Sequence, residues 1–139
     1  MINPIPKAQN IDFPGKLDIT VDATDLDHRI FAVSENVPVS CAGDLVLLLP
    51  KWLPGNHTPG AELSKIAGIK VSAGDKSLTW TRDPVEVNGF HIDVPEGVTA
   101  IKVDFQYLSA TEERIGRIVM THDMLNLPWN FAAFYPAGY

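Results

Sequence analysis

The chain has 139 residues, of which 45% are hydrophobic and 20% charged, and its formal net charge is -6. These values are typical of one soluble globular domain with its own core, and they argue against a disordered or fibrous protein. Lysines and arginines are scattered singly, so no basic surface is predicted and nucleic acid is not expected as a partner. No apolar run approaches the roughly twenty residues of a membrane span, so no membrane partner is expected. The bacterial cytoplasm and the periplasm both remain open as compartments.

Hydrophobic alternation predicts strands through the first half of the chain. Residues 17–21 alternate apolar and polar side chains, which indicates a strand with one face in solvent. Residues 30–33 and 37–39 predict a second strand, interrupted by the polar residues between them and again at Pro38. Residues 45–49 are apolar at every position, as expected for a central strand covered on both faces.

The second half of the chain predicts one short helix and further strands. Residues 63–68 have apolar side chains at helical spacing, and Gly68 would end that helix in the left-handed conformation. Residues 69–73 and 78–82 flank a Gly-Asp-Lys turn, which is a hairpin signal. Three more strands are predicted, at residues 85–94, 98–108 and 117–120.

These elements predict an all-β fold, an antiparallel β-sandwich with one short helix, and a β-barrel is the second choice. We expect residues 1–15 to form an N-terminal arm and residues 16–139 to form the sandwich. Aromatic side chains on the strands are expected to lie mostly in the core, together with two of the tryptophans: Trp80, Phe90, Phe105, Tyr107 and Trp129.

Residues 50–60 form a loop that neither a sheet nor a helix can contain, because Pro lacks the backbone donor and Gly loses most entropy on ordering. We expect Trp52, held between prolines, to pack in part on this loop or on the end of the sandwich. The alternative is an interaction surface. Pro54, Gly55 and His57 complete the candidate interface, although His57 also fits a plain exposed loop residue.

No catalytic or metal-binding motif is present. The four histidines do not pair at metal-ligand spacing and no His-Glu-x-x-His occurs, so neither a catalytic residue nor a metal site is expected in this chain. His91 is interpreted as a surface residue of a strand. Cys41, the single cysteine, is interpreted as a small core residue and cannot form an internal disulfide.

Residues 125–139 are unusually aromatic for a chain end. We expect this segment to be the attachment site of another part of a longer polypeptide, through four aromatic residues: Trp129, Phe131, Phe134 and Tyr135.

The residues from Leu47 to His57, Leu-Leu-Leu-Pro-Lys-Trp-Leu-Pro-Gly-Asn-His, resemble the Pro-x-Trp-x-Pro-Gly signature of a known family. That family is the amino-terminal domain of the glycyl aminopeptidases, zinc metallopeptidases with a thermolysin-like catalytic domain. Further segments fit the family in the same order, at residues 29–33, 37–39, 63–68, 80–85, 105–109 and 124–126.

The resemblance implies a parent protein with an amino-terminal β-sandwich, a zinc-binding catalytic domain and a PDZ domain. No catalytic residue and no cofactor transfers to this chain, and only Trp52, Pro54 and Gly55 match the signature. We therefore expect a non-catalytic domain that packs on the catalytic domain of the same polypeptide and helps shape the cleft for a peptide substrate. Two alternatives remain: a carbohydrate- or ligand-binding sandwich that uses Trp52 and His57, and an immunoglobulin-like protein-interaction module.

Overall fold

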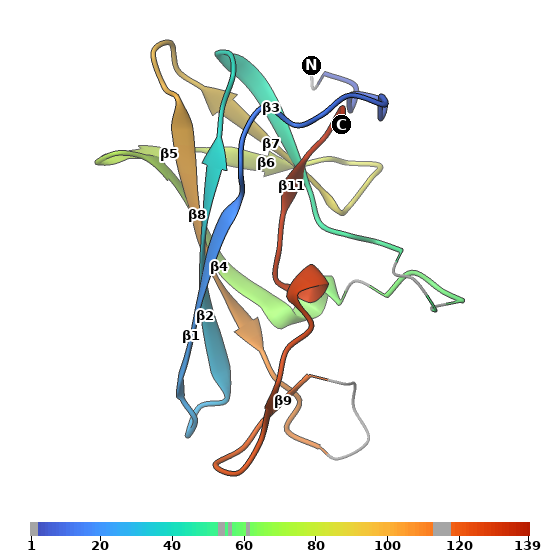
Figure 1. The fold of residues 1–139 in the computed structure, drawn as a ribbon, viewed down its shortest axis with the longest axis vertical. Helices are drawn as coiled ribbons and strands as arrows, with labels where there is room; N and C mark the ends of the chain where they lie inside the picture. The colour runs from blue at the N-terminus through green and yellow to red at the C-terminus, as the bar shows by residue number, and fades with distance from the viewer. Residues whose placement is uncertain (1–2, 53–54, 56, 61, 113–117) are drawn as a thin grey trace.

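The chain folds as an antiparallel β-sandwich, which confirms the predicted fold class (Figure 1). The computed structural model describes residues 3–52, 55, 57–60, 62–112 and 118–139. One sheet has five strands in the order β1 (Asp18–Asp25), β2 (Ile30–Pro38), β8 (Ala100–Leu108), β4 (Ile66–Ala73) and β5 (Lys76–Leu78). The facing sheet has four strands in the order β11 (Tyr135–Pro136), β3 (Gly43–Leu48), β7 (Gly89–Val94) and β6 (Trp80–Arg82). A small hairpin joins β9 (Val119–Met120) to β10 (Leu125–Asn126).

Strand β8 confirms its predicted alternation, because buried residues alternate with partly or fully exposed residues along its whole length. Strand β2 pairs with it over nine consecutive residues, from Ile30 opposite Leu108 to Pro38 opposite Ala100. The predicted interruption of β2 is therefore wrong. The side chain of Glu35 points into the core like those of the apolar residues two positions before and after it, and it is 0% exposed. A polar residue at this position is therefore a buried acid and does not interrupt the strand.

The predicted helix over residues 63–68 is also wrong. Only a 3-10 turn, η1 (Leu63–Lys65), precedes β4, which begins at Ile66. Gly68 does adopt a left-handed conformation, with φ of 64°, but within a β-bulge between Ala67 and Lys70. Such a bulge favours glycine because a side chain is strained at positive φ. Within the described ranges no helix is long and apolar enough to cross a membrane.

Two other predicted strands have different limits in the structure. Residues 78–82 do not form one strand, since β5 belongs to the larger sheet and β6 to the smaller one. Residues 85–88 precede β7 as a turn, because Asp83 Oδ1 accepts hydrogen bonds from the N–H groups of Val85 and Glu86 at 2.8 and 2.7 Å. The Asp83 carboxylate thus binds two backbone N–H groups that a strand would use to pair with its neighbour, and the chain turns locally.

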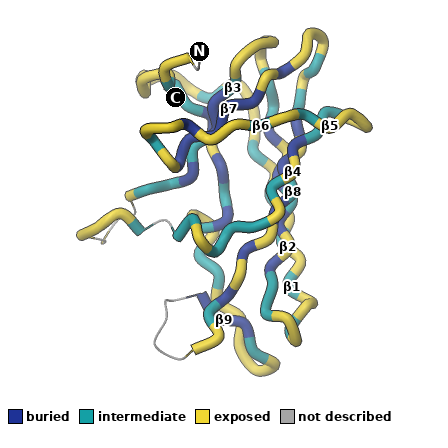
Figure 2. Tube along the Cα trace, turned by 180° about the vertical axis from the view of Figure 1, so that it is seen from behind, coloured by how far each residue is buried: buried dark blue, intermediate teal, exposed yellow. Residues whose placement is uncertain are grey.

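The core lies between the two sheets, where the buried stretches of both sheets are found (Figure 2). Aromatic side chains pack together within it. The Phe134 ring lies 5.1 Å from Phe90 of β7 and 5.2 Å from Phe105 of β8, both in edge-to-face geometry. Phe134 thereby contacts aromatic rings from both sheets. Trp80, predicted in the core, is half-buried and its ring lies 5.5 Å from Phe90. Trp129 does not join them, because 60% of it is exposed.

The N-terminal arm lies beside the C-terminal end of the chain (Figure 1). The Gln9 N–H donates to the Gly138 carbonyl at 3.2 Å, and the Phe13 ring meets the Tyr139 ring edge-on at 5.1 Å. Cys41 lies in the connection between β2 and β3, where it is exposed, so its interpretation as a core residue is wrong.

Phe134→Ala should lower the free energy of unfolding by about 3–5 kcal/mol, because it removes a fully buried ring that contacts both sheets. Urea denaturation monitored by circular dichroism measures this loss. The neighbouring residue provides the control: Tyr135 is 40% exposed, so Tyr135→Ala should cost far less. Equal losses for the two variants would contradict the central position of Phe134.

Candidate functional site

Trp52 lies four residues beyond the end of β3, and most of its side chain is in solvent. The preceding Leu49 is buried, whereas 61% of Trp52 is exposed. Most of the Trp52 side chain is therefore in solvent, and its expected partial packing on the loop or the sandwich end stays a prediction. Gly55, with φ of 84°, and His57 are exposed beyond it, and Pro54 lies outside the described residues. The Gly60 N–H donates to the Lys51 carbonyl at 2.8 Å and closes the base of this loop, called here the Trp52 loop.

A turn between β6 and β7, residues 83–88, braces the base of the Trp52 loop. The Lys51 ammonium lies 3.0 Å and 3.2 Å from the two carboxylate oxygens of Glu86. The Leu49 N–H donates to the Asn88 carbonyl at 3.0 Å, and the Asn88 side-chain amide donates to the Leu49 carbonyl at 3.4 Å. The turn and the Trp52 loop project on the same side of the molecule (Figure 1).

The bracing turn has its own apolar tip, since Val85 is 90% exposed and Val87 48% exposed. Together with Trp52, these side chains place three exposed apolar groups on two loops that are joined by an ion pair. The sequence interpretation found Trp52 but missed the turn, which it assigned to a strand. The Asp-Pro pair at Asp83 and Pro84 was a usable turn signal.

His91 fixes the other end of the turn and is buried, so its interpretation as a surface residue is wrong. Its Nε2 lies 3.1 Å from Asp83 Oδ2, and its Nδ1 lies 3.1 Å from both carboxylate oxygens of Asp44. Burial lowers the pKa of His91, but the hydrogen bonds to Asp83 and Asp44 outweigh it and leave the pKa above the usual 6.5. Only the imidazolium can donate from both nitrogens, so the geometry favours the charged ring.

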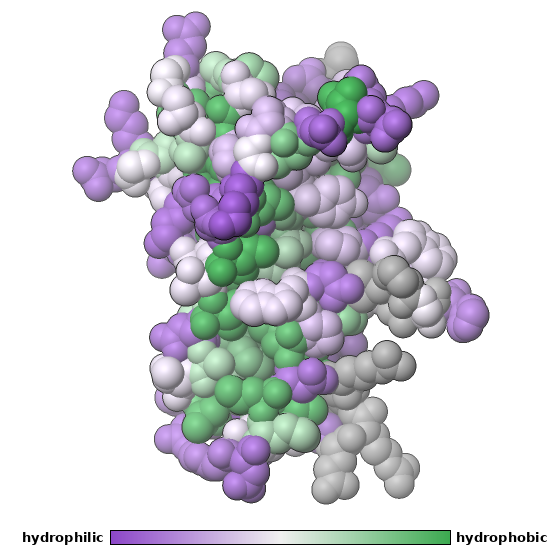
Figure 3. Space-filling view, viewed as in Figure 1, coloured by the Kyte–Doolittle hydropathy of each residue, from purple (hydrophilic) through white to green (hydrophobic). Residues whose placement is uncertain are grey.

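The C-terminal segment, residues 125–139, presents a second exposed apolar region. Trp129 lies in η2 (Trp129–Phe131) and is 60% exposed, while Tyr135 is 40% exposed on β11. Phe131 is half-buried, and Phe134 is a core residue. Met124 and Leu125 at the β9–β10 hairpin add to the same face. Figure 3 shows weakly polar and apolar side chains gathered there over η2, β11 and the hairpin.

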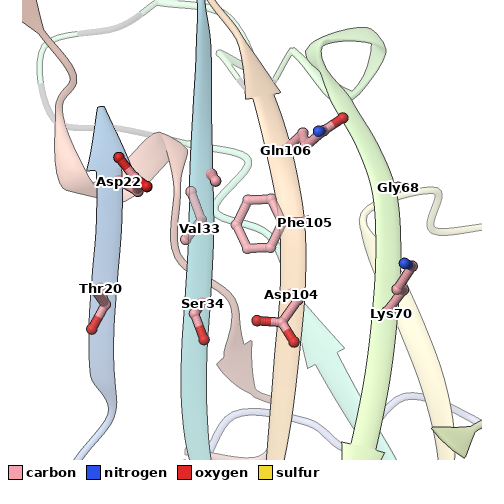
Figure 4. Close-up of a pocket in the computed structure, with 10 residues that line it drawn as sticks. Thr20, Asp22, Val33, Ser34, Gly68, Lys70, Asp104, Phe105 and Gln106 are labelled. Carbon is pink, nitrogen blue, oxygen red and sulfur yellow. The ribbon is translucent and has the colours of Figure 1, made fainter. Parts of the chain in front are cut away.

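A hollow of about 430 Å³ lies on the outer face of the larger sheet (Figure 4). Its acidic groups are engaged locally: Asp22 accepts hydrogen bonds from Thr24 at 2.7 and 2.9 Å, and Asp104 pairs with Lys102 at 3.0 Å. The hollow arises where Gly68 and Ala32 carry no large side chain between polar neighbours. We interpret it as the solvated outer face of the sheet.

No three histidine, cysteine, aspartate or glutamate side chains gather in a metal-binding arrangement within the described part of the chain. A zinc ion therefore has no fitting ligand set in these residues, and no reaction step can be derived from them.

Comparisons with known proteins agree with this architecture. The model of the Peptidase M61 N-terminal domain matches residues 18–139. The chain belongs to this family. Its fold is similar to that of the aminopeptidase N family protein from Idiomarina loihiensis, with a TM-score of 0.69 and 15% sequence identity over 87% of this chain. That similarity covers 20% of the Idiomarina chain, so this M61 N-terminal domain spans a fifth of that protein. No curated protein matches the sequence.

Trp52→Ala should change the free energy of unfolding by less than about 1 kcal/mol, because most of the ring is already in solvent. The matched control is Trp80→Ala, which removes a half-buried ring whose Nε1–H donates to the Ile69 carbonyl at 3.1 Å. That variant should lose about 3 kcal/mol in the same urea denaturation. A large loss for Trp52→Ala would show that its ring supports the fold.

Asp44→Asn should lower the pKa of His91, because one of the two carboxylates that favour the imidazolium loses its charge. In the wild-type domain, protonated His91 stabilises the fold fully below pH 6.5, and this contribution is lost as the pH rises through the raised pKa. NMR titration of the imidazole protons measures the change, with exposed His28 as the internal control. A wild-type midpoint at or below 6.5 would contradict the geometry.

Proposed function

We propose that this domain is the non-catalytic amino-terminal part of a zinc metallopeptidase and packs on the catalytic domain of the same polypeptide. The observation that carries the proposal is the exposed C-terminal segment of an M61 N-terminal domain. Trp129, Tyr135 and Leu125 leave apolar area in solvent there, and each Å² covered by a partner would contribute about 25 cal/mol. Exposed apolar side chains gathered on one segment of this kind favour an interaction site.

The Trp52 loop, in this proposal, helps wall the cleft that receives the peptide substrate. Support comes from the brace: Lys51, Glu86 and Asn88 hold the base of the loop, so Trp52 can be presented to a ligand without a large ordering cost. Exposed His57 belongs to the same loop. The zinc ion, held by the catalytic domain, would activate water for amide hydrolysis, and this domain would position the substrate.

The isolated chain should not hydrolyse glycyl or alanyl amide substrates when zinc is added. The physical reason is that metal-assisted amide hydrolysis needs ligands and a general base that the described residues do not bring together. Activity that copurifies with the chain through chromatography and disappears with a chelator would contradict the proposal.

In the full-length peptidase, Trp129→Ser should expose the C-terminal segment to hydrogen exchange and promote proteolysis between the domains. Leu108→Ser is the matched control, because Leu108 is an exposed apolar residue on the outer face of the larger sheet. Trp52→Ala should raise KM several-fold and leave domain packing intact. The packing proposal fails if Trp129→Ser and Leu108→Ser behave alike, and the cleft proposal fails if Trp52→Ala leaves KM unchanged.

A further inference from the structure

Glu35 is an acid placed inside the sandwich core. It is 0% exposed and lies on β2, directly opposite Ile19 of β1 and Val103 of β8. Its Oε2 accepts a hydrogen bond from the Phe134 N–H at 2.8 Å. Its other oxygen, Oε1, has no hydrogen-bond partner in the described part of the chain. A buried carboxylate with an unpaired oxygen is costly, whereas a protonated carboxyl is neutral and costs less to bury.

Among the described residues, no charged group contributes to the pKa of Glu35. The neighbouring titratable groups on its own and adjacent strands point to the outer face of the sheet by alternation: Asp18, Lys102 and Asp104. On the C-terminal segment, titratable Tyr135 is exposed. Burial raises the pKa of Glu35 from 4.5 to about 7, and the hydrogen bond from Phe134 only partly opposes this rise. Glu35 therefore changes charge near neutral pH.

The element that Glu35 holds has few backbone hydrogen bonds to the sheets, although the Phe134 ring packs between them. Between η2 and the chain end, the segment pairs with β3 through only two residues, Tyr135 with Leu48 and Pro136 with Leu47. The Ala137 N–H adds a bond to the Val46 carbonyl at 2.8 Å. By contrast, β2 and β8 are interior strands paired on both sides. Short, sparsely paired elements open at lower free energy than such interior strands.

We propose that Glu35 is a proton-operated clamp: as a neutral acid it holds the C-terminal segment through the Phe134 N–H, and its ionisation releases that segment while the rest of the sandwich stays folded. Opening would let water reach the carboxylate and would withdraw Phe134 from between the sheets. Exposed Trp129 and Tyr135 lie on the released segment, so the clamp would also control the surface that meets the catalytic domain. That consequence rests on the proposed packing role, whereas the clamp itself does not.

The direction of the pH effect follows from proton binding. Between pH 4.5 and about 7 the closed state keeps the proton of Glu35 and the opened state releases it, so opening becomes more favourable as the pH rises. The opening constant should rise about tenfold per pH unit in this window and level off above it. The total rise from the two pKa values is about 300-fold.

Hydrogen exchange of the 139-residue chain, read by NMR and corrected for intrinsic exchange rates, tests the clamp. The amides of Phe134 and Ala137 should lose protection with this pH profile, while the amides of β2 and β8 should keep theirs. Glu35→Gln retains an oxygen acceptor for the Phe134 N–H but cannot ionise, so the profile should become flat. Asp104→Asn, a change on the exposed face of β8, should leave the wild-type profile unchanged.

Each outcome decides the question. A flat wild-type profile at Phe134 would overturn the clamp, and so would an equal loss of protection at every amide, since it would make Glu35 a determinant of global unfolding only. The wild-type comparison between segment and interior strands needs no variant, so it still decides if Glu35→Gln fails to fold. Failure here would leave the packing proposal intact, because the activity and proteolysis of the full-length protein test that proposal separately.

Discussion

The contact of Phe134 with both sheets is the packing interaction that links the C-terminal segment to the two layers of the sandwich. Its ring touches Phe90 of the smaller sheet and Phe105 of the larger sheet, and its N–H is bound by Glu35. Neither sheet supplies another aromatic ring that meets both partners among the described residues. A residue close to the chain end therefore joins the two layers, and this ties core packing to the position of the C-terminal segment.

The Trp52 loop depends on a different kind of support, which is polar. The proline-rich sequence of the loop cannot make ladder bonds, so its position has to be set by neighbours. The turn at residues 83–88 provides them through the Lys51–Glu86 ion pair, and His91 holds the turn through Asp83. A partly buried ion pair and a bridged histidine orient a loop more specifically than apolar packing would, because their geometry is directional.

Much of the fold could be predicted from the sequence because strand alternation is a local property. It located β1 and β8 and identified the sandwich. The failures have physical causes at single positions. Glu35 is polar but faces inward, so the alternation of apolar and polar residues does not reveal that β2 continues through it. Gly68 predicts a helix end because helix ends and β-bulges use the same left-handed conformation. The exposure of Trp129 and Cys41 depends on which tertiary partners cover them, and no local pattern carries that information.

The candidate site likewise has one part that the sequence predicts and another that depends on tertiary contacts. Trp52 was identified from its own sequence, because flanking prolines remove it from any sheet. Its brace could not be predicted, since Lys51 and Glu86 are 35 residues apart and meet only once β3 and β7 have paired. In the C-terminal segment, local alternation and tertiary packing act together. Successive residues of an extended chain point to opposite faces, so Phe134 enters the core and Tyr135 remains exposed. Any partner that binds the exposed side of this segment must therefore act on the same stretch of chain that carries Phe134 into the core.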